Sequence, residues 1–238
     1  MYDLHSHILP GIDDGSRDIE MSMSMLQASI SQGIEGIALT PHFYADHSTP
    51  DRFLEKRTRA ADSLAQAIME KKIECPPLLL AAEVHFYRGM SRSRDLERLT
   101  YGDSRYILIE MPFSEWTSST VTEIGDIRAN LGLTPVLAHI GRYLGQKKAY
   151  IKELLSMDGL LIQSNSEFFL ERKTAHKALR MLKAGNIDLL GSDCHNISDR
   201  KPDLGDAVEY IRNRSGDEPL WEIRRNSEKI FRAAGAVR

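Results

Sequence analysis

The chain alternates between short apolar runs and longer stretches in which apolar residues recur at helical spacing. The short runs are rich in Ile, Leu and Val and have the length of buried strands. We expect seven strands, at residues 3–5, 36–40, 78–83, 106–110, 135–139, 159–163 and 188–192. Helices are expected at residues 19–32, 52–71, 118–131, 148–156, 174–184, 206–212 and 227–234.

This alternation of strands and helices predicts a parallel sheet of the α/β class. Seven such units in 238 residues are close to the roughly 250 residues of an α/β barrel. We therefore predict one barrel domain that spans residues 1–238. An open, doubly wound sheet is the alternative. Its nucleotide-binding version is disfavoured because no glycine-rich phosphate loop follows the first strand.

Residues that can bind metal follow six of the seven predicted strands. In chain order they are His5 with His7, His42, Glu83, Glu110, His139, and Asp193 with His195. The carboxyl ends of barrel strands form one rim, where the chemistry of such proteins lies, so these side chains should meet. Asp13 and Asp14 could add a further carboxylate from the first loop, although Asp-Asp-Gly is also ordinary turn chemistry. The pattern predicts a metal site at the rim.

The chemistry of these residues indicates the kind of metal and reaction. Imidazoles and carboxylates without thiolate suit Mn²⁺, Fe or Zn²⁺, whereas Ca²⁺ and Mg²⁺ prefer oxygen ligands alone. The ligands are too numerous for one ion and suit three ions if one carboxylate bridges. Three divalent ions would outweigh the carboxylates and leave a positive centre that favours a phosphate dianion. Such clusters promote in-line displacement by water.

Composition excludes several other classes of protein. The formal net charge of −3 leaves no basic footprint for nucleic acid. No run of 18 apolar residues could span a membrane, and the N-terminus has no secretory signal. The two cysteines, Cys75 and Cys194, do not form a disulfide framework. We expect a cytoplasmic protein that neither enters a membrane nor binds nucleic acid.

The candidate residues lie in runs that resemble the polymerase and histidinol phosphatase (PHP) superfamily. These runs are His-Ser-His at 5–7, Leu-Pro-Gly-Ile-Asp-Asp-Gly at 9–15, Thr-Pro-His at 40–42, Ala-Glu at 82–83, Ile-Glu at 109–110, Ala-His-Ile-Gly-Arg-Tyr at 138–143 and Ser-Asp-Cys-His at 192–195. The runs at 9–15 and 139–143 are specific to one branch, the bacterial capsular-polysaccharide metal-dependent protein-tyrosine phosphatases. The resemblance covers residues 5–226.

That resemblance implies a distorted (β/α)7 TIM-like barrel with three divalent metal ions, of which Mn is expected and Fe or Zn are alternatives. It implies hydrolysis of phosphotyrosine on the tail of a bacterial tyrosine autokinase that regulates capsular or exopolysaccharide synthesis. Arg142 and Arg200 match the arginines that grip phosphate in this branch. The ligands transfer as three groups: His5, His7, Glu83 and Asp193 for the first ion; Glu83 as a bridge, with Glu110 and His139, for the second; Asp14, His42 and His195 for the third.

Other functions stay open at this point. One is a small-molecule phosphomonoesterase of the histidinol-phosphatase type, and another is a non-catalytic metal-binding domain. Cys194 and Arg200 also have the Cys-x5-Arg spacing of cysteine-dependent phosphatases. However, no glycine lies between them to form a loop around phosphate. Strand alternation should also turn Cys194 away from Asp193 and His195, so a thiol mechanism is disfavoured.

Overall fold

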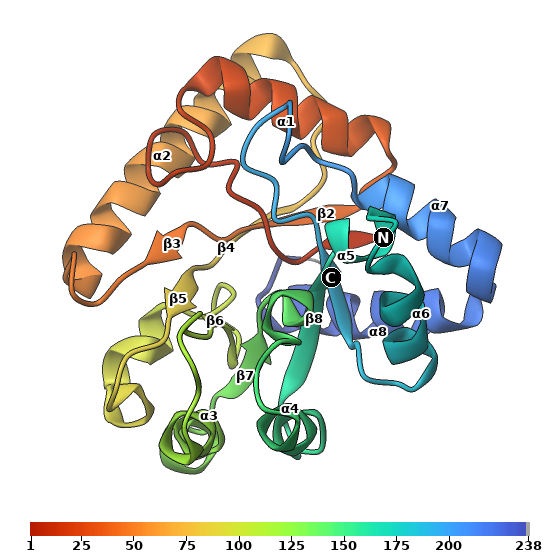
Figure 1. Cartoon of the computed structure of the whole chain (residues 1–238). Helices are drawn as coiled ribbons and strands as arrows, with labels where there is room; N and C mark the ends of the chain where they lie inside the picture. Colours follow the sequence, from red (N-terminus) through yellow and green to blue (C-terminus); the bar gives the residue numbers. More distant parts are fainter. Residues whose placement is uncertain (237–238) are drawn as a thin grey trace.

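Parallel strands form a curled sheet with helices outside it in the computed structural model, which describes residues 1–236 (Figure 1). The strands are β1 (Tyr2–Asp3), β2 (Gly36–Leu39), β3 (His42–Phe43), β4 (Leu78–Leu80), β5 (Glu83–His85), β6 (Tyr106–Glu110), β7 (Thr134–Leu137), β8 (Leu161–Asn165) and β9 (Leu189–Gly191). One hydrogen-bonded sheet has the order β1-β2-β4, and the other has the order β3-β5-β6-β7-β8-β9.

Helices connect the strands. They are α1 (Ile19–Ser31), α2 (Pro50–Lys71), α3 (Ser118–Leu131), α4 (Lys148–Leu155), α5 (Glu167–Leu170), α6 (Ala175–Lys183), α7 (Leu204–Ser215) and α8 (Glu218–Ala233), with 3₁₀ turns η1 (Met90–Arg92), η2 (Arg94–Arg98) and η3 (Ile140–Tyr143). The side chains of Asp18, Thr49 and Thr117 accept backbone N–H groups at the starts of α1, α2 and α3. Within residues 1–236, every helix is too short or too polar to span a bilayer.

The two sheets are continuous with each other in the chain and in hydrogen bonding. Chain segments β2 and β3 are separated by Thr40 and Pro41, and the latter has no N–H to donate. Across this break, the N–H of Glu83 still donates to the carbonyl of Pro41 at 3.0 Å. On the other side, the N–H of Leu4 donates to the carbonyl of Leu190 at 3.1 Å, next to β1 and β9. The strands therefore curl into one parallel arrangement.

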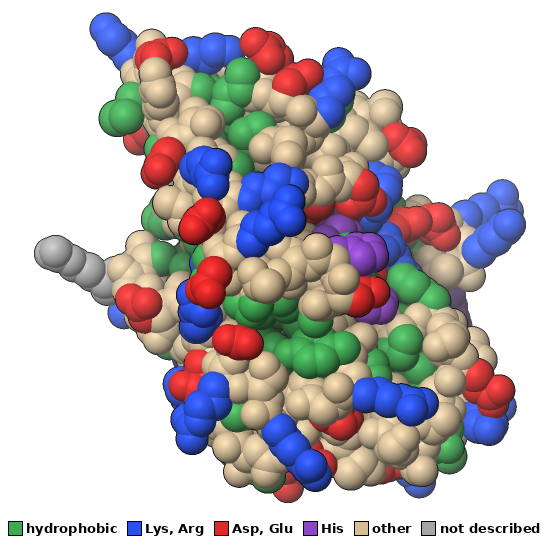
Figure 2. Space-filling model, turned by 90° about the vertical axis from the view of Figure 1, so that its left-hand side faces the viewer, with side chains coloured by type: hydrophobic (Ala, Val, Ile, Leu, Met, Phe, Trp, Pro, Cys, Tyr) green, Lys and Arg blue, Asp and Glu red, His purple; other side chains and the backbone are tan. Residues whose placement is uncertain are grey.

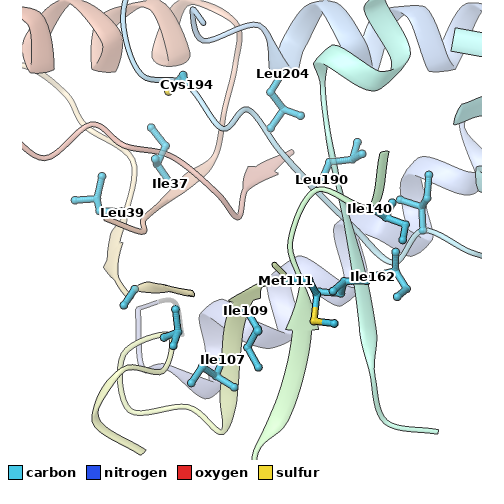
Figure 3. Close-up of a cluster of buried hydrophobic side chains, with 14 of the residues drawn as sticks. Ile37, Leu39, Ile107, Ile109, Met111, Ile140, Ile162, Leu190, Cys194 and Leu204 are labelled. Atoms are coloured by element: carbon cyan, nitrogen blue, oxygen red, sulfur yellow. The ribbon is translucent and has the colours of Figure 1, made fainter. Parts of the chain in front are cut away.

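The strands are apolar on both faces, as expected for a parallel sheet covered by helices. One face packs in a large cluster with the helices, and Figure 3 shows Ile37, Ile107, Ile109, Ile162 and Leu190 there. The opposite face forms a smaller cluster, whose strand residues are Ala38, Leu79, Leu108, Val136 and Leu189. Successive residues of a strand, such as Ile37 and Ala38, thus lie in different clusters. The smaller cluster marks the inner face of the curl, and the larger one, which we call the outer cluster, lies between the sheet and the helices.

Most predicted elements are confirmed, and the differences have local causes. Strand β6 and helix α3 have the predicted bounds. The predicted strand 36–40 corresponds to β2, which is followed by the unpredicted short strand β3, and the predicted strand 78–83 is divided into β4 and the start of β5. Strand β8 runs to Asn165 rather than ending at 163, since its polar residues are buried inside the curl. Helix α8 begins nine residues before the predicted 227, where Pro219 occupies the first turn. Helix α5 was not predicted, because it has a single turn.

Candidate metal centre

The period of the strands brings the candidate ligands to the inner face. Leu108 belongs to the inner cluster, and Glu110 follows it by two residues on β6. Ala81 is also in the inner cluster, and Glu83 follows it by two residues. Because alternate residues of a strand share a face, both carboxylates point to the same inner side as the apolar residues two positions before them. The polar rim is thus an extension of the inner core.

Four residues form the innermost part of the site, and we call them the inner group: His5, His7, Glu83 and Asp193. Their side chains are 0–3% exposed. The Nε2 atoms of His5 and His7 are 3.1 Å apart. Glu83 Oε2 lies 3.2 Å from the first of these nitrogens and 3.3 Å from the second. Asp193 Oδ1 is 3.5 Å from His5 Nε2 and 3.4 Å from His7 Nε2.

A second set of ligands meets beside His7. Asp14 Oδ1 is 3.4 Å from His42 Nε2 and 3.5 Å from His195 Nε2. These three residues and His7 each place one ligand atom within 4.8 Å of the others. The Asp14 side chain is 65% exposed, in contrast to the inner group. This set forms the open side of the site.

The third predicted set, Glu83, Glu110 and His139, also comes together. His139 Nε2 lies 2.9 Å from Glu83 Oε1 and 3.5 Å from Glu110 Oε1. His42 joins the two glutamates in a group whose ligand atoms lie within 4.8 Å of one another. His85 reaches the same rim, since its Nδ1 is 2.8 Å from Glu110 Oε2. All nine sequence-predicted ligand residues therefore converge.

The backbone around the site takes unusual conformations. His139 has φ of 33° and Asp193 has φ of 52°, a region that side chains with a Cβ rarely occupy. Two glycines permit close approach to the histidines. A Cβ on Gly15 would lie 2.4 Å from His7 Cβ, and one on Gly191 would lie 2.5 Å from His5 Cβ. Local strain and tight backbone packing thus place the ligand side chains.

Asp13 has a different position from its neighbour Asp14. Its Oδ2 lies 2.7 Å from His7 Nδ1 and accepts the backbone N–H of His42 at 3.0 Å. A carboxylate on Nδ1 fixes the imidazole tautomer and leaves Nε2 free to face the site. Asp13 therefore supports two of the ligand residues instead of facing the centre itself.

Electrostatics keeps the buried carboxylates ionised. Burial opposes the charge of Glu83, but His5 and His42 hold the pKa of Glu83 well below its usual range. The pKa of Asp193 is likewise low, because His5 and His7 outweigh its burial. Burial disfavours protonated His139, yet its contacts with Glu110 and Glu83 raise the pKa of His139 to about 9. The low carboxylate pKa values and the raised pKa of His139 show that these side chains favour positive charge in their midst.

Unpaired atoms show that the residues fit a metal better than they fit one another. Glu83 Oε2, His42 Nδ1 and His195 Nε2 are buried without a hydrogen bond to any described residue. The first two atoms are nevertheless 2.9 Å apart. Buried polar atoms seldom lack partners, and imidazole and carboxylate donors directed at common points suit divalent transition metals. The donor set is therefore suited to metal ions.

Both predicted arginines reach the centre at Asp193. Arg142 Nη2 is 2.7 Å from Asp193 Oδ2, and Arg200 Nη2 is 2.9 Å from the same oxygen. Their side chains are 32% and 33% exposed, so each guanidinium is also open to solvent. Figure 2 shows histidines reaching the surface beside acidic and basic side chains. Two cations at the rim could receive an anionic group.

An exposed aromatic side chain, Phe113, lies beside His139 at the edge of the site. It is 58% exposed, and its ring is nearly parallel to that of His139, with centroids 6.2 Å apart. Tyr143 supports it from behind at 5.7 Å. The loop around Phe113 is braced, because Trp116 donates its indole N–H to the carbonyl of Pro112 at 2.8 Å. A fixed apolar surface thus borders the centre.

A cavity of 560 Å³ adjoins Asp14 and His42. Tyr44, Arg52 and Lys56 also line it. The cavity extends the site beyond the ligands and offers basic groups to whatever enters it.

Cys194 lies outside this constellation. It is fully buried in the outer apolar cluster (Figure 3), whereas Asp193 and His195 face the centre. Burial, reinforced by Asp3, raises the pKa of the Cys194 thiol well above its usual value. A buried protonated thiol is a poor nucleophile, so the Cys-x5-Arg spacing does not form a thiol-based site.

Comparison with known proteins agrees with this geometry. Residues 1–232 match the profile of a family described as capsular polysaccharide synthesis, CpsB/CapC. The chain belongs to the CpsB/CapC family. A tyrosine-protein phosphatase CpsB from Streptococcus agalactiae serotype V is 30% identical to this CpsB/CapC protein over 230 residues, which cover 92% of each chain. Tyrosine-protein phosphatase YwqE from Bacillus subtilis is 27% identical, with 98% of this chain and 92% of that protein covered.

A solved structure has the same fold. It comes from work on YwqE from Bacillus subtilis and CpsB from Streptococcus pneumoniae, which are described as unique metal-dependent tyrosine phosphatases. The TM-score is 0.85 at 27% identity, with 98% of this CpsB/CapC protein and 95% of the solved chain covered. The resemblance inferred from the sequence motifs is confirmed.

Several residues of the site were not predicted from the sequence of this CpsB/CapC protein. Phe113 carries no metal-ligand signal and lies in a loop after β6. Gln163 and Asn165 are buried at the centre, at 0% and 4% exposure. A signal for the two amides existed, because they lie two residues apart directly after the apolar run at 160–162, but amides are weaker indicators of a site than His, Asp or Glu. Only the tertiary contacts show what these residues touch.

Proposed function

We propose that this protein is a metal-dependent phosphatase that hydrolyses phosphotyrosine in proteins. The observation that carries the proposal is the convergence of nine metal-ligand residues with Arg142 and Arg200 at one rim, in a chain of the CpsB/CapC family. Relatives named tyrosine-protein phosphatases support the reaction. Ligand chemistry and the arginines support a phosphate substrate.

We propose three divalent metal ions, with Mn as the expected metal. The inner group would hold the first, Glu83 with Glu110 and His139 the second, and Asp14, His42 and His195 the third. Contacts of 2.9 to 3.5 Å between ligand atoms within these groups support this division. His42 also lies beside Glu83, so it could contribute to either neighbouring ion.

Held by these residues, such ions would polarise a bound phosphate and supply a water molecule of lowered pKa as the nucleophile. Arg142 and Arg200 donate hydrogen bonds to phosphate oxygens and stabilise the charge that spreads over them in the transition state. Asp13 keeps His7 in the required tautomer. The leaving phenol has a pKa of about 10, so the reaction does not require a strong general acid from the protein.

The surroundings of the centre support an aryl substrate carried on a protein. Phe113 offers an apolar surface next to His139, where the ring of phosphotyrosine would lie. The cavity with Arg52 and Lys56 offers room and positive charge for a peptide. We propose that the natural partner is the phosphorylated tail of a bacterial tyrosine autokinase that controls capsule or exopolysaccharide synthesis. A cytoplasmic location stays a prediction.

For the fold, we propose that the two sheets together make the distorted (β/α)7 TIM-like barrel. Support comes from hydrogen bonds between the segment that joins β2 to β3 and the segment that joins β4 to β5, in which Ala81 and Glu83 donate to the carbonyls of Leu39 and Pro41. Further support comes from the N–H of Leu4, which donates to the carbonyl of Leu190 beside β1 and β9. Counted in this way, β2 with β3 is one barrel strand, and β4 with β5 is another.

The test compares three substrates before and after metal removal. The purified protein is treated with a chelator, reloaded with Mn²⁺, Fe²⁺ or Zn²⁺, and assayed on p-nitrophenyl phosphate, a phosphotyrosine peptide and histidinol phosphate. We expect loss of turnover on chelation, recovery with Mn²⁺ and preference for the phosphotyrosine peptide, with three ions per chain by elemental analysis. Preference for histidinol phosphate would favour a small-molecule phosphatase. Metal uptake without turnover would indicate a non-catalytic metal-binding domain.

A further inference from the structure

Strand β8 differs from its neighbours at the rim. Within the described residues, each of the remaining strands of the curl, with β2 and β3 counted as one and β4 and β5 as another, leads to a His, Asp or Glu of the centre. Strand β8 instead carries the amides Gln163 and Asn165. Both amides are buried, and they lie two residues apart on one face of the strand. Buried amides need hydrogen-bond partners, so their contacts show what they do.

These contacts form a continuous chain among the ligand residues. The Asn165 amide donates to Asp193 Oδ2 at 2.7 Å, and its Oδ1 accepts the amide of Gln163 at 3.1 Å. Gln163 Oε1 accepts the backbone N–H of His139 at 2.6 Å and lies 3.4 Å from His5 Nδ1. The pair therefore connects three ligand residues without itself facing the metal positions.

One carboxylate oxygen receives three donors. Asp193 Oδ2 is contacted by Asn165, Arg142 and Arg200 at 2.7 to 2.9 Å. Its other oxygen, Oδ1, faces the histidines of the inner group. The arginines are about one-third exposed and have long, flexible side chains. Asn165 is short and buried, so it alone of the three donors is confined to this contact.

We infer that Asn165 is a positioning residue, which keeps Asp193 oriented when Arg142 and Arg200 turn from that carboxylate to a phosphate. A guanidinium directed at phosphate withdraws hydrogen bonds from Asp193 Oδ2. The Asn165 amide remains, so Oδ1 stays directed at the inner group. Gln163 fixes Asn165 in turn. The inference rests on the proposed function for the movement of the arginines, whereas the support of Asp193 is visible in the structure.

The experiment measures metal binding, with inorganic phosphate as the probe of the arginines. Mn²⁺ is titrated calorimetrically into metal-free wild type, Asn165→Ala and Asn165→Asp, with and without saturating phosphate. Loss of a residue that supports a ligand typically weakens metal binding by about 10- to 100-fold. We expect this loss in both variants, and a larger loss when phosphate is present. In Asn165→Asp, a carboxylate replaces the donor without a change of size, so the effect does not depend on a cavity.

Ser164→Ala is the matched control. Ser164 is buried on the same strand, and within residues 1–236 its hydroxyl donates only to the carbonyl of Asn165, at 3.3 Å. Its variant should bind Mn²⁺ like wild type. Wild-type affinity in both Asn165 variants, with and without phosphate, would overturn the inference. Failure of wild type to hydrolyse phosphotyrosine would instead overturn the proposed function, since metal binding is measured separately.

Discussion

The inner group and the residues around it are built differently. The side chains of the inner group, which are His5, His7, Glu83 and Asp193, are at most 3% exposed, and their imidazole nitrogens lie 3.2 to 3.5 Å from their carboxylate oxygens. We call Asp14, Arg142, Arg200 and Phe113 the outer residues, and these are 32–65% exposed. Rigid strand ends can fix the geometry that metals require, whereas exposed side chains can move to meet a substrate. The comparison suggests that metal binding and substrate selection are separable.

The largest effect is expected from the inner group. His5→Ala combined with His7→Ala removes two buried imidazoles that face the same point, so turnover should fall to background with every substrate. Metal content should fall with it, while circular dichroism stays that of a folded protein. His176→Ala, on the exposed surface of α6, serves as the control. Near wild-type turnover and metal content in the double variant would refute the assignment of the inner group.

Asp14 tests the boundary between the two groups, because it is exposed yet proposed as a ligand. Asp14→Ala should raise the Kd of the most weakly held ion by at least about 100-fold, the upper range for lost support of a metal ligand. Excess Mn²⁺ should restore part of the turnover. The measurement is metal titration followed by assay at each metal concentration. If the ion count and Kd are unchanged, Asp14 belongs with the substrate-binding residues.

Arg142→Ala should lower turnover while the metals stay bound. Charge-assisted hydrogen bonds to phosphate contribute roughly 1.5–3 kcal/mol each. At about 1.4 kcal/mol per tenfold change, kcat/KM should fall by one to a few powers of ten. Arg142→Lys should recover only part of this, because lysine lacks the planar fork. Steady-state kinetics with elemental analysis provides the check. If Arg142→Ala has normal kinetics, Arg142 does not bind the phosphate, and Arg200 becomes the candidate for that contact.

Phe113→Ala should have a smaller effect that depends on the substrate. Packing between aromatic rings is worth about 0.5–1.5 kcal/mol, so kcat/KM for a phosphotyrosine peptide should fall by roughly two- to tenfold. Hydrolysis of glycerol phosphate, which has no ring, should not change. Trp221→Ala, at another exposed aromatic residue on α8, is the control. Equal losses on both substrates would show that Phe113 does not contact the aryl group.

The smallest effect is expected at Cys194, which is buried but faces the outer cluster. Cys194→Ser should keep wild-type kcat/KM and metal content, and iodoacetamide should not inhibit the wild type, since the raised pKa keeps the thiol protonated. Normal activity of this variant would show that a buried residue next to the metal ligands need not take part in catalysis. Inactivity of the serine variant, together with resistance of the wild type to chelators, would assign the chemistry to the thiol.

The sequence alone determined the parallel α/β architecture and the residues at the rim. Strand and helix periods are local properties of the chain, and a strand end places its next polar residue predictably. The rules of alternation also separated Cys194 from Asp193 correctly. These inferences required no knowledge of which strands lie side by side.

Only the tertiary structure decided which residues meet. The pairing of β8 with β9 brings Asn165 to Asp193, 28 residues away in the chain. The contact of both arginines with one carboxylate oxygen, and of Phe113 with His139, likewise joins segments that no local pattern relates. In a sequence, a neutral amide or an aromatic residue gives the same pattern whether it lies in a core or in a functional site. The roles of the amides follow from hydrogen-bond distances, and that of Phe113 follows from its stacking on His139. Only the folded arrangement sets either.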